Sequence, residues 1–151
     1  MAELKGRDKQ QYVSEMFARI SGRYDLMNTL MTGGLHLRWK HQAARFTASG
    51  LTGKALDVAT GTGDLAFSLA GCPGIEWAMG VDALPEMLSL AQGKTKAKNM
   101  DRQTSFVLGD AHALPFPDDS FACATAGFSL RNMSDLDLAL SEMVRVVRRG
   151  G

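Results

Sequence analysis

The chain has 151 residues, of which 45% are hydrophobic and 22% charged, which suits one globular domain with its own core. Its 17 lysines and arginines nearly balance its 16 aspartates and glutamates, so no basic excess points to a nucleic-acid partner. Cys72 and Cys123 lack metal-site spacing and fit a reducing compartment. No apolar run is long enough to cross a bilayer, and the N-terminus has no apolar signal core. These features predict a soluble cytoplasmic protein.

The first 50 residues show helical periodicity interrupted by glycines. Apolar side chains recur every three or four residues over 12–20 and again over 24–31, and a third segment carries His36 and Trp39. We expect a helical cap over residues 1–50, with His36 in a structural hydrogen bond. The side chains expected in the core are Tyr12, Met16, Phe17, Ile20 and Trp39. The alternative is a cap rich in Met and aromatic residues that lines an apolar pocket, with His36 as a base.

Strands and helices alternate from residue 51 onward, which predicts an α/β fold with a parallel sheet over residues 51–151. Glycines, prolines and capping residues separate the segments. We expect strands over 54–58, 77–81, 104–108 and 121–128, and helices over 64–70, 85 to about 94, and 135–148, the last capped by Ser134.

Polar groups follow the ends of these strands, where open α/β sheets bind ligands. Gly61 and Gly63 would let a ligand approach backbone N–H groups at the start of a helix, as nucleotide sites do. Asp82 could accept both ribose hydroxyls of an adenosine, and Asp110, followed by Ala111, could meet the adenine amino group. Taken singly, Asp82 also fits a helix cap and Asp110 a turn.

The glycine loop fits two cofactors. Gly61-x-Gly63-x-x-Ala66 matches the dinucleotide fingerprint of an NAD-dependent oxidoreductase. Asp57 inside the first strand favours S-adenosylmethionine instead, because Asp57-x-Ala59-x-Gly61-x-Gly63 resembles the class I methyltransferase loop. Asp57 itself is better suited to steadying the loop by accepting backbone N–H groups than to contacting substrate.

Several further blocks resemble one family, the menaquinone/ubiquinone biosynthesis C-methyltransferases. The likeness covers nearly the whole chain from Tyr12 onward, in several spaced blocks. These are Tyr24-Asp25-Leu26-Met27-Asn28, Met31-Thr32, His36-x-x-Trp39, 57–65, 114–121, Phe128-Ser129-Leu130-Arg131-Asn132 and 145–151. The chain departs from the family pattern in carrying Thr32 for Ser, Gly127 for Ser, Ser129 for Gly and Arg149 for Pro. The resemblance implies a Rossmann-like class I fold with S-adenosylmethionine as cofactor.

The implied reaction is transfer of a methyl group to a ring carbon of a prenylated quinol, as in conversion of demethylmenaquinol to menaquinol or the related step of the ubiquinone pathway. By position, the cofactor would be held by Thr62, Asp82, Asp110 and Ala111, together with Gly61 and Gly63. Arg131 would favour the phenolate electrostatically or hold a water that accepts the proton, and Asn132 and Tyr24 would orient the ring. No residues have the spacing of a metal site.

The chain stops at Gly151, where the resembled family continues into a fifth strand of a seven-stranded sheet. With four strands in the order 3-2-1-4, the fourth would be an unpaired apolar edge. We therefore expect a fragment of a longer product. The alternatives are a homo-oligomer paired through that edge and a cofactor-binding fragment without full activity. The apolar N-terminal stripe is the expected place for peripheral membrane contact with a membrane-dissolved quinol.

Overall fold

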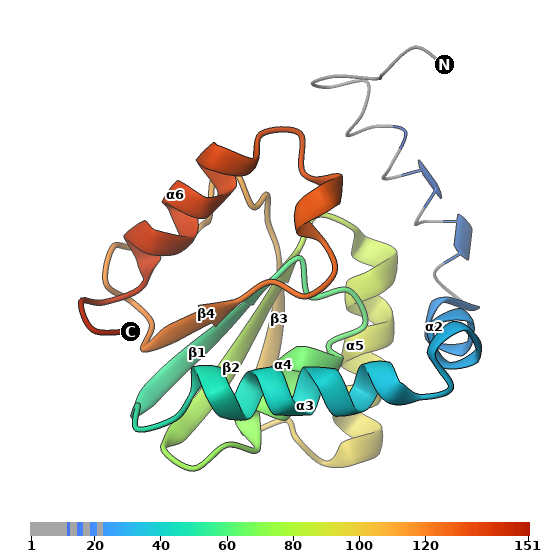
Figure 1. Ribbon diagram of the computed structural model, residues 1–151, viewed down its shortest axis with the longest axis horizontal. Helices are drawn as coiled ribbons and strands as arrows, with labels where there is room; N and C mark the ends of the chain where they lie inside the picture. Colours follow the sequence, from blue (N-terminus) through green and yellow to red (C-terminus); the bar gives the residue numbers. More distant parts are fainter. Residues whose placement is uncertain (1–11, 13–14, 17–18, 21–22) are drawn as a thin grey trace.

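A computed structural model, which describes residues 12, 15, 16, 19, 20 and 23–151, contains a parallel sheet with helices on both faces (Figure 1). The strands lie in the order β3-β2-β1-β4, and every pairing is parallel. They are β1 (Gly53–Val58), β2 (Ile75–Asp82), β3 (Thr104–Leu108) and β4 (Cys123–Thr125). The predicted α/β class and the 3-2-1-4 order are both confirmed.

The helices divide between the two faces of the sheet. Those described are α2 (Tyr24–Thr32), α3 (Leu35–Thr47), α4 (Asp64–Ala70), α5 (Pro85–Lys98), the 3-10 helix η2 (Leu130–Asn132) and α6 (Leu136–Val146). In Figure 1, α3 crosses one face beside α4, with α5 next to them, and α6 covers the opposite face. Right-handed crossovers between parallel strands place the helices in this way.

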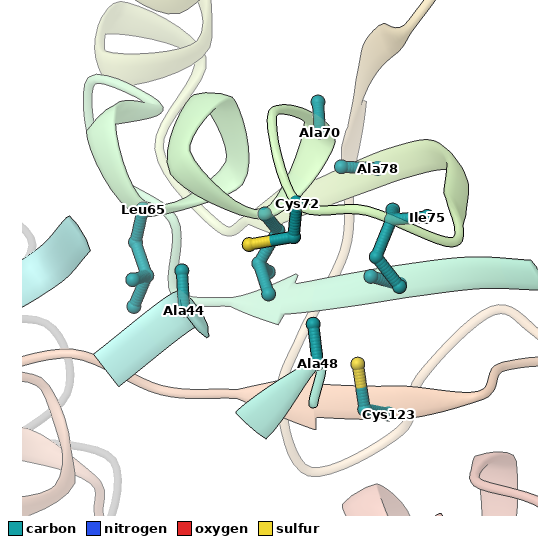
Figure 2. Packing of buried hydrophobic residues seen from close by; sticks show 10 residues of the cluster. Ala44, Ala48, Leu65, Ala70, Cys72, Ile75, Ala78 and Cys123 are labelled. Carbon is teal, nitrogen blue, oxygen red and sulfur yellow. The ribbon is translucent and has the colours of Figure 1, made fainter. Parts of the chain in front are cut away.

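Alternation along β1 separates the core into two clusters, because successive strand residues point to opposite faces. Ala55 faces α3 and α4, whereas Leu56 and Val58 face α6. Figure 2 shows the first cluster, where the small side chains Ala44 and Ala48 let α3 approach the sheet closely. It also contains both cysteines, Cys72 and Cys123, which are free thiols whose pKa values are raised by burial.

Arg145 fastens the proline-punctuated loop over 114–118 to α6. Its guanidinium donates to the carbonyl oxygens of Leu114 and Phe116, and it forms an ion pair with Asp118 at 2.8 Å. The same guanidinium holds the pKa of Glu142 down at about 2, and the Glu142 carboxylate accepts the Leu114 N–H at 2.8 Å. The loop after β3 is thereby held in one position beside the sheet.

Three predicted boundaries were wrong. The run over 121–128 forms a strand only at 123–125, because Phe121 is drawn into a bridge with Val147 and Phe128 has a φ of +62°. Asp135, not Ser134, caps α6 by accepting the Leu138 N–H at 3.0 Å. β2 begins at residue 75, two residues earlier than expected, because it pairs there with the start of β1.

The prediction that the aromatic and Met residues of the cap are core was also wrong for those the structure describes. Tyr12 is 59% exposed, Met16 38% and Trp39 48%, whereas Phe17 lies outside the described residues. Periodicity predicts an apolar stripe, but it cannot show whether another segment covers it. Among the described residues, no helix is long and apolar enough to span a membrane.

Candidate functional site

The turn after β1 holds two glycines for different reasons. Gly61 (φ +57°) and Gly63 (φ +86°) both have left-handed backbone that disfavours a side chain. A Cβ at Gly63 would lie 2.7 Å from the ring of Phe106, whereas one at Gly61 would meet nothing within 4 Å. Gly63 is therefore required by packing, and Gly61 leaves open space above the turn.

Asp82 ties the end of β2 to this turn. Its Oδ2 accepts the Gly61 N–H at 2.7 Å, and its Oδ1 accepts the Leu84 N–H at 3.0 Å. Burial of the carboxyl group raises its pKa, and the backbone N–H groups oppose that rise. Each carboxylate oxygen has a second lone pair, so the group can still accept hydrogen bonds from a ligand.

A pocket of about 150 Å³ lies beyond the carboxyl ends of the strands. Its walls come from the turn after β1, the ends of β2 and β3, and the segment around η2. The lining includes five of the predicted site residues, Gly61, Asp82, Asp110, Ala111 and Asn132. These groups, far apart in the sequence, therefore share one cavity.

Four predicted site residues lie outside this pocket. Gly63 is buried beneath the turn, and Thr62 lines a smaller neighbouring pocket. Arg131 is exposed on η2. Tyr24 begins α2, and its side chain lies outside the part of the chain that the structure describes.

The smaller pocket adjoins the first one and shares three of its lining residues, Ala59, Gly61 and Gly127. Lys40 reaches it from α3 with a side chain that is only 13% exposed, and its Nζ lies 3.1 Å from Asp64 Oδ2. A cation and a hydroxyl thus stand at one end of the combined cavity, with Asp82 and Asp110 in the larger pocket.

Thr62 belongs to a network of charges that the sequence did not reveal. Its hydroxyl donates to Asp25 Oδ1 at 2.7 Å and accepts from Lys94 Nζ at 2.9 Å. Lys94 Nζ also lies 2.6 Å from Asp25 and 2.7 Å from Asp64. The two lysines lower the pKa of Asp64 against the opposing effect of its burial. This network connects α2 to the start of α4 and to the C-terminal half of α5, beside the glycine turn.

Replacing Lys94 with Met should lower the free energy of unfolding by about 1–2 kcal/mol, because two carboxylates lose their shared cation while the side-chain volume is kept. Urea unfolding monitored by circular dichroism would measure the change. Lys96→Met is the matched control, since Lys96 lies on the same helix and is exposed. Equal losses in the two variants would contradict a stabilising role for the network.

Asp57 is fully buried below the turn, where the hydroxyls of Thr60 and Thr125 donate to it at 2.6 and 2.8 Å. The predicted steadying role is supported, with hydroxyl donors in place of the expected backbone N–H groups. Burial raises the pKa of Asp57 to about 6, against the lowering effect of both hydroxyls.

Asp57 should therefore make the protein more stable on the acid side. The folded state takes up a proton between about pH 6 and pH 4 that the unfolded state does not, and this pKa difference corresponds to about 3 kcal/mol. The free energy of unfolding of the wild type, relative to that of Asp57→Asn, should increase as the pH falls from 7 to 4. This relative gain should disappear when the pH is raised again. Urea unfolding of both proteins across this range measures the difference, and a flat difference would refute it.

His36 has a structural role, as one of the two interpretations of the sequence predicted. It is 3% exposed, and its Nδ1 lies 2.9 Å from the Thr32 hydroxyl, which holds together the turn between α2 and α3. It lines neither pocket. Such a buried, hydrogen-bonded position does not suit a base that must reach a substrate.

Sequence reasoning missed His112 among the polar residues that line the main pocket. His112 contacts Asp110 and also the segment before α6, and no motif marks it. Ser129 lines the same pocket, and its buried hydroxyl has no hydrogen-bond partner among the described residues. An unsatisfied buried hydroxyl is costly, so it is a group that a polar ligand in this pocket could satisfy. The glycine turn, the two aspartates and this hydroxyl fit a nucleoside cofactor.

Comparison with solved structures identifies the fold. A structure described as the [4+2]-cyclase SpnF matches with a TM-score of 0.79 and 25% identity, covering 95% of this chain and 58% of that one. A SAM-dependent methyltransferase from Aquifex aeolicus matches with a TM-score of 0.65 and 22% identity, covering 78% and 62%. Together with the strand order and the pocket beyond the strand ends, these matches show the Rossmann-like fold of the class I S-adenosylmethionine-dependent methyltransferases.

The particular family follows from sequence comparison. The model of the ubiE/COQ5 methyltransferase family matches residues 5–151, and the chain belongs to that family. The demethylmenaquinone methyltransferase of Thermus thermophilus is 42% identical over 137 residues, 90% of this chain and 61% of the relative. The ubiquinone/menaquinone biosynthesis C-methyltransferase UbiE of Cellvibrio japonicus is 43% identical, with 95% and 58% covered. The chain thus spans about three fifths of the length of these relatives.

Proposed function

We propose that this chain provides the cofactor-binding part of an enzyme that methylates a ring carbon of a prenylated quinol. The observation that carries the proposal is the pocket in which Gly61, Asp82 and Asp110 meet, in a chain of the ubiE/COQ5 family. The names of the relatives support demethylmenaquinol, or the related ubiquinone precursor, as the acceptor. An NAD-dependent oxidoreductase finds no support in the family match.

Asp82 would accept hydrogen bonds from the ribose hydroxyls of S-adenosylmethionine, and Asp110 would accept one from the adenine amino group, with Ala111 against the ring. Gly61 would let the cofactor approach the turn. Thr62 lines the smaller pocket with Lys40, whose charge suits the carboxylate of the methionine part. Gly63 would act by holding the turn. We also propose residues 1–50 as a cap on the substrate side of the core formed by residues 51–151.

When bound, S-adenosylmethionine supplies a methyl group on a positive sulfur, and the transfer exchanges a ring C–H proton for a C–CH3 bond and releases S-adenosylhomocysteine. We assign to Arg131 the electrostatic stabilisation of a phenolate form of the ring, either directly or through a water that accepts the proton. Asn132, which lines the pocket, and Tyr24 would orient the ring.

Two titrations and one turnover assay test the proposal. Isothermal titration calorimetry should show binding of S-adenosylhomocysteine and none of NAD. Incubation with methyl-labelled S-adenosylmethionine and a short-chain demethylmenaquinol should then transfer label to the quinol. Tight binding of NAD alone would refute the assignment. Cofactor binding without any label transfer would leave the chain as a cofactor-binding unit and refute an activity of its own.

We further propose that the chain works in the cytoplasm and meets its substrate at the membrane surface through α2 and α3. Exposed apolar side chains on these helices support this, among them Leu30 (74%), Met31 (81%) and Phe46 (87%). Sedimentation with vesicles would test the contact. Pairing of two copies along β4, the other proposed association, would appear as a dimer in sedimentation equilibrium.

A further inference from the structure

His112 bridges two walls of the main pocket. Its Nδ1 lies 2.6 Å from Asp110 Oδ1, and its Nε2 accepts the Asp135 N–H at 3.2 Å, with the Ser134 hydroxyl 3.4 Å away. Asp110 follows β3, whereas Ser134 and Asp135 precede α6. The side chain of His112, which is 15% exposed, therefore connects two segments that are far apart in the sequence.

The contacts define which nitrogen of the His112 ring carries the hydrogen. A backbone N–H can only donate, so Nε2 must be the acceptor toward Asp135, and Nδ1 carries the hydrogen that is donated to Asp110. The backbone N–H of His112 donates to the same Asp110 oxygen at 2.9 Å. Two donors on Oδ1 hold the carboxyl group against rotation and so set the direction of Oδ2.

We propose that His112 is a positioning residue that holds Asp110 for recognition of an adenine amino group, and so sets a preference for adenine over a 6-oxopurine. This inference rests on the proposed function, in which Asp110 meets the adenine. A freely turning carboxylate could accept from an adenine amino group in several poses, whereas a fixed one discriminates by direction. A 6-oxo group would place one acceptor against another, so Oδ2 of Asp110 would receive no hydrogen bond from it.

Two substitutions separate the two contacts of the ring. The amide nitrogen of Asn lies near the position of Nδ1, so His112→Asn can still donate to Asp110. The longer Gln side chain carries its amide near the position of Nε2, so His112→Gln can still accept from Asp135 but loses the contact with Asp110. His41→Asn and His41→Gln are the matched controls, because His41 is exposed on α3 and lies outside both pockets.

Calorimetric titrations with S-adenosylhomocysteine and S-inosylhomocysteine test the inference, with melting temperatures measured for every variant. The wild type and both His41 variants should bind the adenosyl compound at least about tenfold more tightly than the inosyl compound. His112→Asn should keep that ratio to within about threefold. His112→Gln should bring the ratio below about three while its melting temperature stays close to that of His112→Asn.

The outcomes distinguish this inference from the function on which it rests. A wild type that binds neither compound would overturn both. A wild type that binds S-adenosylhomocysteine without preference over the inosyl compound would leave the proposed function standing and overturn the role of His112. The same holds if His112→Gln retains the wild-type ratio, or if His112→Asn loses the ratio as completely as His112→Gln does.

Discussion

Gly63→Ala should destabilise the protein by about 3 kcal/mol and lower its melting temperature by roughly 10 °C. The added methyl group would lie 2.7 Å from the ring of Phe106 and 3.1 Å from that of Phe67, and the φ of +86° adds strain of its own. Neither ring can easily withdraw, because the two pack edge to face with centroids 5.6 Å apart. Thermal unfolding measured by calorimetry would give the loss directly.

Gly61→Ala provides the matched comparison, since Gly61 has the same left-handed backbone but open space around it. We expect a stability loss of about 1 kcal/mol from the backbone alone. Its affinity for S-adenosylhomocysteine should nevertheless fall at least tenfold, because the methyl group occupies space that the ligand needs at the turn. If the two variants lost equal stability, overlap with Phe106 would not be the cause.

Asp82→Asn should weaken binding of S-adenosylhomocysteine about a hundredfold while changing stability by less than about 1 kcal/mol. An amide has one oxygen, so its NH₂ group must face either an N–H of the protein or a hydroxyl of the ribose. In the free protein, the loss of one accepted hydrogen bond is offset, because burial already disfavours the charged form of Asp82, as its raised pKa indicates. The substitution therefore separates binding from folding.

Calorimetric titration and thermal unfolding of the same Asp82→Asn preparation would measure both effects. Asp101→Asn is the control, because Asp101 is exposed in the turn before β3 and lies outside the pocket. An affinity within threefold of the wild type would show that Asp82 acts only within the protein, as a partner of the Gly61 and Leu84 N–H groups.

Burial of the cap and the length of β4 could not be predicted from local patterns. Periodicity over residues 12–20 predicts that one face is apolar, yet Tyr12 and Met16 are exposed, because covering that face depends on segments elsewhere in the chain. β4 is confined to three residues by the bridge between Phe121 and Val147, a pairing with the chain beyond α6. The strand propensity of a short apolar run does not depend on such distant partners, so it cannot predict them.

The sequence by itself determined the α/β class, the strand order, and the placement of Gly61, Asp82 and Asp110 at one edge of the sheet. Alternating periods and the handedness of parallel crossovers leave few other arrangements, and parallel strands bring their carboxyl ends to the same edge. Only the tertiary structure decided that Asp25 pairs with Lys94 beside the turn and that His112 holds Asp110. Those contacts depend on how two helices and two loops settle against the sheet, which no spacing along the chain specifies.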